Sequence, residues 1–219
     1  MSLKPRNKKN MNKNEIDYNK YTEYLSKRDP KLGLLIKQHG IVKLPPKEDS
    51  FTKFIKIIIN QQLSNKAAST IFSRLENNIT KFVPSHVYKV DDYLFRNAGV
   101  SKQKTSYIKN IAKLFLENKN LTEKLENLND IDLEKYLISV KGLGQWSSSM
   151  YMMFNMHRIN MFTYGDVALN KSIKSIYNID VKNKDDFDEL SKLENLWSPY
   201  KTLACLYLWK YVDSDESFL

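Results

Sequence analysis

Two glycines, Gly142 and Gly144, lie two residues apart between two predicted helices, in the segment 138–146. Glycine tolerates positive φ, so the chain can reverse sharply there, and the missing side chains let a phosphate approach the backbone. The amides of both glycines and of the next helix's first turn would then donate to that anion. An ordinary tight turn between helices is the alternative, and the segment alone leaves both interpretations open.

A carboxylate follows these glycines along the chain. Asp166 lies 20 residues after Trp146 and directly after Gly165, at the predicted start of a helix. A carboxylate at that place faces the positive end of the helix dipole, which keeps it ionised. The simpler interpretation is that Asp166 only caps the helix, which is the commoner reason for aspartate at such a position.

Helices are expected on both sides of the glycines and after Asp166. Ser50 offers an N-cap for the helix that begins at Phe51, whereas Pro30 and Gly33 predict a break before it. No segment alternates as a β-strand would, so we expect an all-α fold of nine or ten helices. The expected helices span about 17–27, 51–62, 65–75, 91–97, 102–118, 130–140, 145–157, 166–177 and 199–212.

The charge balance is positive. The chain has 35 basic and 25 acidic residues, a formal net charge of +10. Residues 1–14 contain five basic residues and no acidic one, and we expect them to form a disordered tail ahead of a single folded module over 15–219. Such a charge favours a polyanionic partner, although plain solubility explains it equally well.

Cysteine and histidine are scarce. A chain with one cysteine, Cys205, and three scattered histidines forms no internal disulfide and no cysteine-cluster metal site. We therefore expect no catalytic metal, and a reducing, intracellular setting. No apolar run approaches the ~18 residues of a membrane span, so no membrane association is expected.

Taken together, these segments resemble a known family. Helix, Gly-Leu-Gly hairpin (about 132–157), helix, loop and aspartate is the pattern of the helix-hairpin-helix DNA glycosylase superfamily, and the chain is most similar to its 3-methyladenine DNA glycosylase II family. The resemblance covers about 50–212 and implies two helical subdomains that flank a base-binding cleft. Four stretches carry it: 58–68 with Gln61-Gln62 and paired alanines, 98–104 with Gly99-x-Ser-x-x-Lys, the hairpin through Asp166, and 197–210 with Trp-Ser-Pro-Tyr before a Trp-containing final helix.

The resemblance implies roles for individual residues. Asp166 matches the one essential acid, which would stabilise an oxocarbenium-like sugar and orient or deprotonate water. Trp146 stands where bifunctional members carry a lysine nucleophile, so it implies a hydrolase with no lyase step. Its ring suits stacking on a cationic alkylated purine. Gln62 matches the residue that fills the gap left by a flipped base.

Two further groups of residues are implied. The expected DNA contacts are Gln62, Lys141, Gly142, Gly144, Gln145, Trp146 and Ser147. The expected base pocket consists of Trp146, Tyr164, Trp197 and Tyr200, although such aromatic residues are also common in cores. No cofactor or metal-binding side chain is expected; the resemblance implies only a structural monovalent cation at the hairpin backbone.

The implied function is hydrolysis of the N-glycosidic bond of alkylated purines such as 3-methyladenine in double-stranded DNA. We expect a monomer that acts in the nucleus of a eukaryote or otherwise in the cytoplasm. A non-catalytic helix-hairpin-helix DNA-binding protein and a glycosylase for another lesion are the alternatives. Lys141 replaces the family's usual proline, Gly165 a frequent acidic residue, and Met150 a residue that is aromatic in some relatives. The last two departures bear on substrate choice.

Overall fold

The computed structural model describes residues 16–79 and 81–215, and all regular secondary structure in that part of the chain is helical. The all-α prediction is therefore confirmed, whereas the predicted tail at 1–14 lies outside the described residues. Within them, no helix combines the length and the apolar character that crossing a membrane requires.

The helices are α1 (Tyr18–Arg28), α2 (Pro30–His39), α3 (Ser50–Asn60), α4 (Asn65–Asn78), α5 (Pro84–Lys89), α6 (Asp92–Ala98), α7 (Lys102–Glu117), α8 (Leu121–Asn127), α9 (Asp130–Ser139), α10 (Gln145–Phe154), α11 (Val167–Tyr177), the 3-10 helix η1 (Lys184–Asp186), α12 (Phe187–Trp197) and α13 (Lys201–Asp215).

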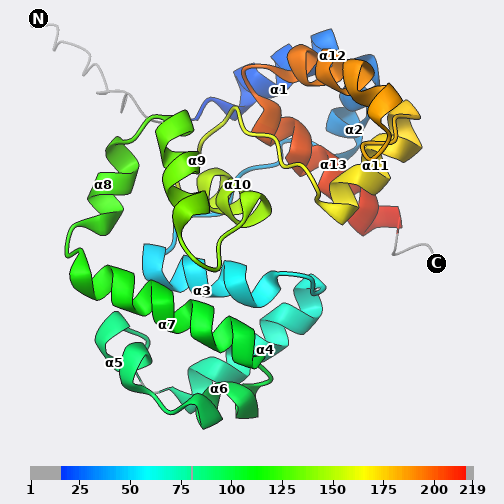
Figure 1. Ribbon diagram of the computed structural model, residues 1–219. Helices are drawn as coiled ribbons and strands as arrows, with labels where there is room; N and C mark the ends of the chain where they lie inside the picture. Colours follow the sequence, from blue (N-terminus) through cyan, green and yellow to red (C-terminus); the bar gives the residue numbers. More distant parts are fainter. Residues whose placement is uncertain (1–15, 80, 216–219) are drawn as a thin grey trace, which may run out of the picture.

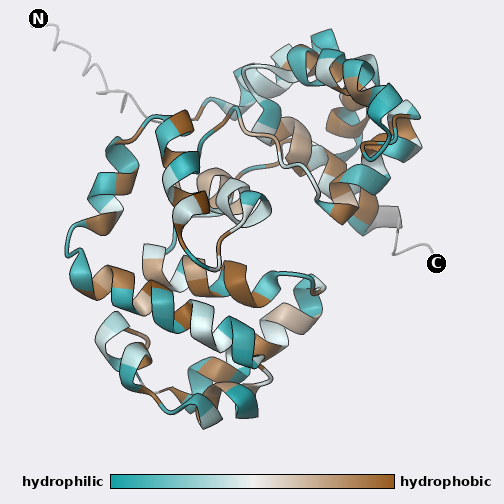
Figure 2. Cartoon of the chain, viewed as in Figure 1, coloured by the Kyte–Doolittle hydropathy of each residue, from teal (hydrophilic) through white to brown (hydrophobic). Residues whose placement is uncertain are grey.

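The helices form two bodies with the hairpin between them (Figure 1). One body contains α1, α2, α11, α12 and α13, so the first and last described helices pack together. The other contains α3 to α7, and α8 leads from it to α9. The hairpin of α9 and α10 lies between the bodies, where α10 packs on α3. Helix α7, predicted at 102–118, carries both hydrophobic and hydrophilic residues (Figure 2), and its buried residues Thr105, Ile108, Ile111 and Ala112 lie on one face.

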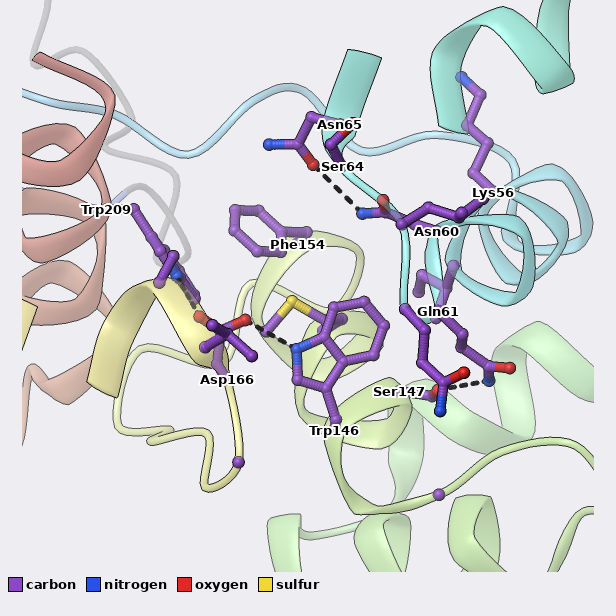
Figure 3. A pocket seen from close by; sticks show the side chains of 18 of the residues that line it. Lys56, Asn60, Gln61, Ser64, Asn65, Trp146, Ser147, Phe154, Asp166 and Trp209 are labelled. Atoms are coloured by element: carbon purple, nitrogen blue, oxygen red, sulfur yellow. Dashed lines mark hydrogen bonds between the residues drawn. The ribbon is translucent and has the colours of Figure 1, made fainter. Parts of the chain in front are cut away.

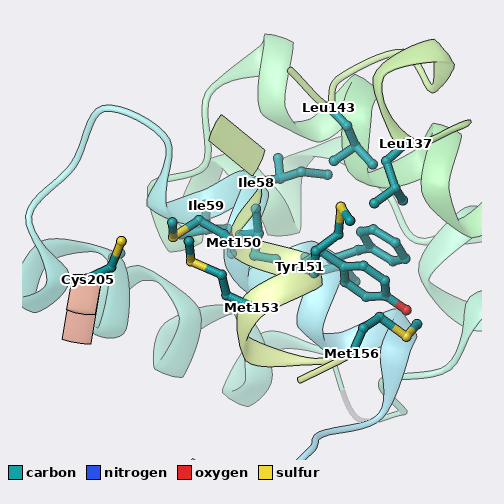
Figure 4. Packing of buried hydrophobic residues seen from close by; sticks show 14 of the residues in the cluster. Ile58, Ile59, Leu137, Leu143, Met150, Tyr151, Met153, Met156 and Cys205 are labelled. Atoms are coloured by element: carbon teal, nitrogen blue, oxygen red, sulfur yellow. The ribbon is translucent and has the colours of Figure 1, made fainter. Parts of the chain in front are cut away.

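Helix α10 is anchored in the second body by buried side chains. Tyr151 stacks on Phe54 of α3 with 4.0 Å between the ring centroids. Its hydroxyl donates to Ser50 Oγ at 3.0 Å. Around it, methionines of α10 pack among apolar side chains of α3 and α9 (Figure 4). Because nearly the whole length of α10 is buried, its N-terminal end at the hairpin is held firmly against α3.

The break predicted at Pro30 is confirmed, because α1 ends at Arg28, whereas the break predicted at Gly33 is wrong. Helix α2 begins at Pro30, a position where a helix needs no amide donor. Asp29 caps it, with Oδ1 accepting from the amides of Lys31 and Leu32 at 3.0 Å. Gly33 lies at the contact with α1, where a Cβ would be 2.8 Å from Ser26 Oγ. Close packing of two helices thus outweighs the weak helix propensity of glycine.

Besides α2, the helices α5, α8 and α12 are not expected from the sequence, so the described residues form thirteen α-helices where nine or ten were predicted. Two of the missed helices, α5 and α8, have only six and seven residues. The cap of α3 also differs from its prediction. Asp49 is the N-cap, and its Oδ2 accepts from the Thr52 amide at 2.9 Å. Ser50 is buried and serves the contact with Tyr151 instead.

Candidate active site

A cleft opens beside the hairpin, lined by the end of α3, the hairpin with α10, the start of α11 and the end of α13 (Figure 3). These four places are far apart in the sequence. The glycines of the hairpin, Trp146 and Asp166 all line the cleft. The tertiary structure therefore brings together the features that the sequence presents separately.

Asp166 is the N-cap of α11, and protein donors hold both of its carboxylate oxygens. Oδ1 accepts from the Leu169 amide at 2.8 Å and from Trp209 Nε1 at 3.0 Å. Oδ2 accepts from Trp146 Nε1 at 2.8 Å. An ionised carboxylate accepts about four such bonds, so Oδ2 retains capacity for one more. The capping interpretation and the active-site interpretation of Asp166 are therefore compatible.

Trp209 of α13 is a site residue that the sequence prediction missed. Besides its bond to Asp166, its ring lies 5.7 Å from that of Phe154, and both rings line the cleft. The stretch 197–210 contains this tryptophan, but nothing in its local pattern indicates a contact with a residue 43 positions earlier. The signal that was available, a tryptophan in the final helix of the matched family pattern, carried no role by itself.

The two hairpin glycines meet different requirements. Gly142 has a φ of 103°, and a Cβ there would lie 2.6 Å from the side chain of Tyr107. Gly144 has a φ of −103° as the N-cap of α10, and a Cβ there would meet nothing within 4 Å. Gly142 thus makes the reversal, while Gly144 leaves open space at the start of α10, next to exposed Gln145.

The remaining predicted DNA contacts are placed in different environments. Lys141 is exposed but is not among the residues that line the cleft. Ser147 is 3 % exposed, and its Oγ accepts a hydrogen bond from Gln61 Nε2 at 2.9 Å. Its side chain is therefore buried and bonded within the protein. Gln62 is exposed along the cleft and lies in the left-handed region, with a φ of 58°.

Trp197 and Tyr200 do not reach the cleft, so the prediction that they line the base pocket is wrong. Trp197 is fully buried and donates Nε1 to Asp29 Oδ2 at 2.8 Å. Tyr200 stacks on Tyr21 of α1 with 4.0 Å between the ring centroids. Both side chains therefore join α1 and α2 to the C-terminal helices.

Tyr164 also lies outside the cleft lining, although it precedes Asp166 by only two residues. Its hydroxyl donates to Oε1 of buried Glu194 at 2.6 Å, and Lys201 Nζ donates to the other oxygen at 2.9 Å. Burial and the bond to this carboxylate raise the pKa of Tyr164 far above its ordinary value. Tyr164 anchors the loop ahead of Asp166, and Trp146 alone of the four predicted aromatic residues lines the cleft.

A glycine hairpin between two helices, followed by a carboxylate in the same cleft, defines a helix-hairpin-helix protein with a candidate acidic active site. Residues 55–199 match the HhH-GPD superfamily of base excision DNA repair proteins, and the chain belongs to that family. The resemblance seen in the sequence is confirmed, as is the fold that it implies.

Individual relatives agree with this assignment. The chain is 34% identical to the DNA-3-methyladenine glycosidase of Bacillus halodurans, with a TM-score of 0.73 over 90% of this chain and 91% of that one. It is 27% identical over 204 residues to the alkylbase DNA glycosidase-like protein mag2 of Schizosaccharomyces pombe, which covers 90% of this chain and 94% of that protein. The fold also matches the 3-methyladenine DNA glycosylase Mag1 of Schizosaccharomyces pombe, solved in complex with abasic DNA, at 24% identity and a TM-score of 0.74 over 87% and 95% of the two chains.

Proposed function

We propose that this protein is a monofunctional DNA glycosylase that hydrolyses the N-glycosidic bond of alkylated purines, such as 3-methyladenine, in double-stranded DNA. The Asp166 carboxylate, held in the cleft by two indoles, is the observation that carries the proposal. Membership of a base excision repair family supports it, as do one relative named a DNA-3-methyladenine glycosidase and another named an alkylbase DNA glycosidase-like protein.

The carboxylate of Asp166 suits a transition state in which positive charge develops on the sugar. As the bond to the base breaks, the sugar becomes oxocarbenium-like. Three donors fix the carboxylate in advance, so little reorganisation is needed when the charge appears. The free capacity on Oδ2 then serves either to face the sugar or to orient the attacking water.

Aromatic side chains beside Asp166 favour a cationic base. Trp146, Phe154 and Trp209 line the cleft near the carboxylate (Figure 3). An electron-rich ring attracts a positively charged alkylated purine by about 0.5–2 kcal/mol, an attraction that a neutral purine lacks. This difference is the basis on which we propose alkylated purines over oxidised or mismatched bases.

The absence of a lyase step follows from Trp146. Its indole nitrogen is a donor only and binds Asp166 at 2.8 Å, so it offers no nucleophile to the sugar. Water is then the nucleophile, and no covalent enzyme–DNA intermediate forms.

Only backbone carbonyls could hold the monovalent cation that the resemblance implies at the hairpin. Carbonyls of the hairpin already accept hydrogen bonds: Val140 from the Leu143 amide at 3.0 Å, Lys141 from Asn110 at 3.2 Å and Gly142 from Gln61 at 2.9 Å. Among the described residues, no cluster of three or more His, Cys, Asp or Glu side chains could hold a metal. Each of these carbonyl oxygens keeps a second lone pair, so the backbone cation stays a prediction, and no step of the mechanism uses it.

We propose DNA as the partner through the hairpin amides and the net positive charge, with one copy of the chain acting on one lesion. The site of action is then the nucleus in a eukaryote and the cytoplasm otherwise.

A panel of duplexes tests the proposed function. Each carries one altered base: 3-methyladenine, 7-methylguanine, 8-oxoguanine, or uracil opposite guanine. We expect release of the methylated purines and no adduct on borohydride treatment. Release of only 8-oxoguanine or uracil would reassign the lesion. Salt-dependent DNA binding without any release would identify a non-catalytic binding protein, and a robust borohydride adduct would contradict the hydrolytic mechanism.

Trp209→Phe tests the second indole. The variant keeps an aromatic ring but removes the donor to Asp166 Oδ1, which retains the Leu169 amide. We expect kcat for base release to fall about 10–100-fold, because a hydrogen bond to a charged group contributes about 1.5–3 kcal/mol. Single-turnover release of 3-methyladenine measures this. An unchanged rate with normal folding would show that Trp209 only packs against Phe154.

A further inference from the structure

Helix α7 carries three residues, spaced three apart on one side, that contact the elements facing the cleft. Lys104 contacts the end of α3, and Tyr107 packs so closely on Gly142 that no Cβ fits there. Asn110 donates its Nδ2 to the Lys141 carbonyl at 3.2 Å. Residues at this spacing lie on neighbouring turns of one helical face. One side of α7 therefore supports both the end of α3 and the hairpin.

Lys104 caps the C-terminal end of α3. Its Nζ donates to the carbonyls of Ile59 and Gln61, both at 2.7 Å. The last carbonyls of a helix lack partners within it, and a cation there also suits the helix dipole. Burial lowers the pKa of this ammonium group. Lys104 thus binds the protein's own backbone, unlike an ordinary surface lysine, which would be free to contact a phosphate.

Gln61, in the same turn after α3, forms further hydrogen bonds that connect this turn to the hairpin. Its Nε2 donates to the Gly142 carbonyl and to Ser147 Oγ, both at 2.9 Å, and Figure 3 shows the second of these bonds. Gln62 follows, exposed and with a φ of 58°. A residue other than glycine in this region costs about 1–3 kcal/mol and persists only where its surroundings hold it. The hydrogen bonds of Lys104 and Gln61 hold the backbone immediately before Gln62 and so stabilise this conformation.

We propose that Lys104 is a positioning residue for Gln62, and that α7 sets the placement of Gln62 relative to the hairpin. The inference rests on the proposed function, in which Gln62 fills the space of the extruded base. The turn that contains Gln62 contacts α7, the hairpin contacts α7, and the turn and the hairpin also contact each other. Gln62 therefore enters the duplex in register with the phosphates that the hairpin amides bind.

The test is Lys104→Met in a protein that also carries Asp166→Asn, so that no base is released. The probe is a duplex with a tetrahydrofuran abasic-site analogue opposite 2-aminopurine, whose fluorescence changes when its stacking changes. We expect the Kd to stay within about threefold of the parent but the fluorescence change to fall by about half or more, since insertion depends on a well-placed plug. Gln62→Ala should lose the same signal, and the two changes combined should lose no more, because they act on one interaction.

Lys113→Met is the matched control, since Lys113 lies on the same helix in an exposed pair with Glu117 at 3.7 Å. It should keep the parental signal, and Lys104→Arg, which retains donors, should recover most of it. A full signal in folded Lys104→Met overturns the positioning role. If circular dichroism shows that this variant is unfolded, Gln61→Met is measured by the same two criteria. A parent that binds none of these duplexes would contradict the proposed function itself.

Discussion

Asp166→Asn should leave the protein folded and able to bind DNA while base release falls at least about 10³-fold, since the charge that stabilises the sugar cation is gone. Asparagine caps helices about as well as aspartate, so the free energy of unfolding should fall only by the cost of one unsatisfied donor, about 1–3 kcal/mol. The amide cannot satisfy all three donors, because its NH₂ group must face one of Leu169, Trp209 or Trp146. The site therefore loses both its charge and its geometry.

Single-turnover release of 3-methyladenine and fluorescence anisotropy of a labelled duplex measure the two properties separately. Asp91→Asn is the matched control, because Asp91 caps α6 through the Tyr93 amide and does not line the cleft. It should keep the parental rate. If Asp166→Asn also released base at the parental rate, Asp166 would be a helix cap and nothing more.

Gly142→Ala should be the most destabilising change in the hairpin. A Cβ at this position would lie 2.6 Å from Cβ and Cγ of Tyr107, atoms near the backbone that cannot swing away. The φ of 103° adds backbone strain for alanine. Strain and overpacking together should cost about 3 kcal/mol, which lowers Tm by about 6–12 °C in a chain of this size. Thermal unfolding followed by circular dichroism measures the change.

Gly144→Ala separates folding from DNA binding. Its φ of −103° suits alanine, and the added methyl group meets open space. Tm should therefore stay within about 2 °C of the parent, while the methyl group obstructs the place where a phosphate approaches the amides, so that DNA affinity falls by roughly tenfold. Equal Tm losses in both variants would mean that the hairpin is not held against Tyr107 as the structure shows.

Local sequence was a good guide to several helix ends, although it assigned the cap of α3 to Ser50 instead of Asp49. The helices expected to begin near 65 and to end near 97 do so, with Ser64 as the cap of α4 and Gly99 in the left-handed region after α6. These features depend on one turn of backbone, so residue type is sufficient to predict them. Where packing between helices decides, the prediction failed, as it did for α2, which continues through Gly33 because Gly33 packs on Ser26 of α1.

The active site divides in the same way. The sequence by itself determined the glycine hairpin between two helices and a carboxylate at the N-terminus of a third, because both rest on residue type and short spacing. The requirement for glycine at 142 comes from the contact with Tyr107 of α7. Only the tertiary structure decided which aromatic residues surround that carboxylate. Trp209 reaches Asp166 while Trp197 turns into the core. Both are tryptophans in the C-terminal helices, and only the packing of α13 against α11 and of α12 against α1 distinguishes a side chain at the cleft from one in the interior.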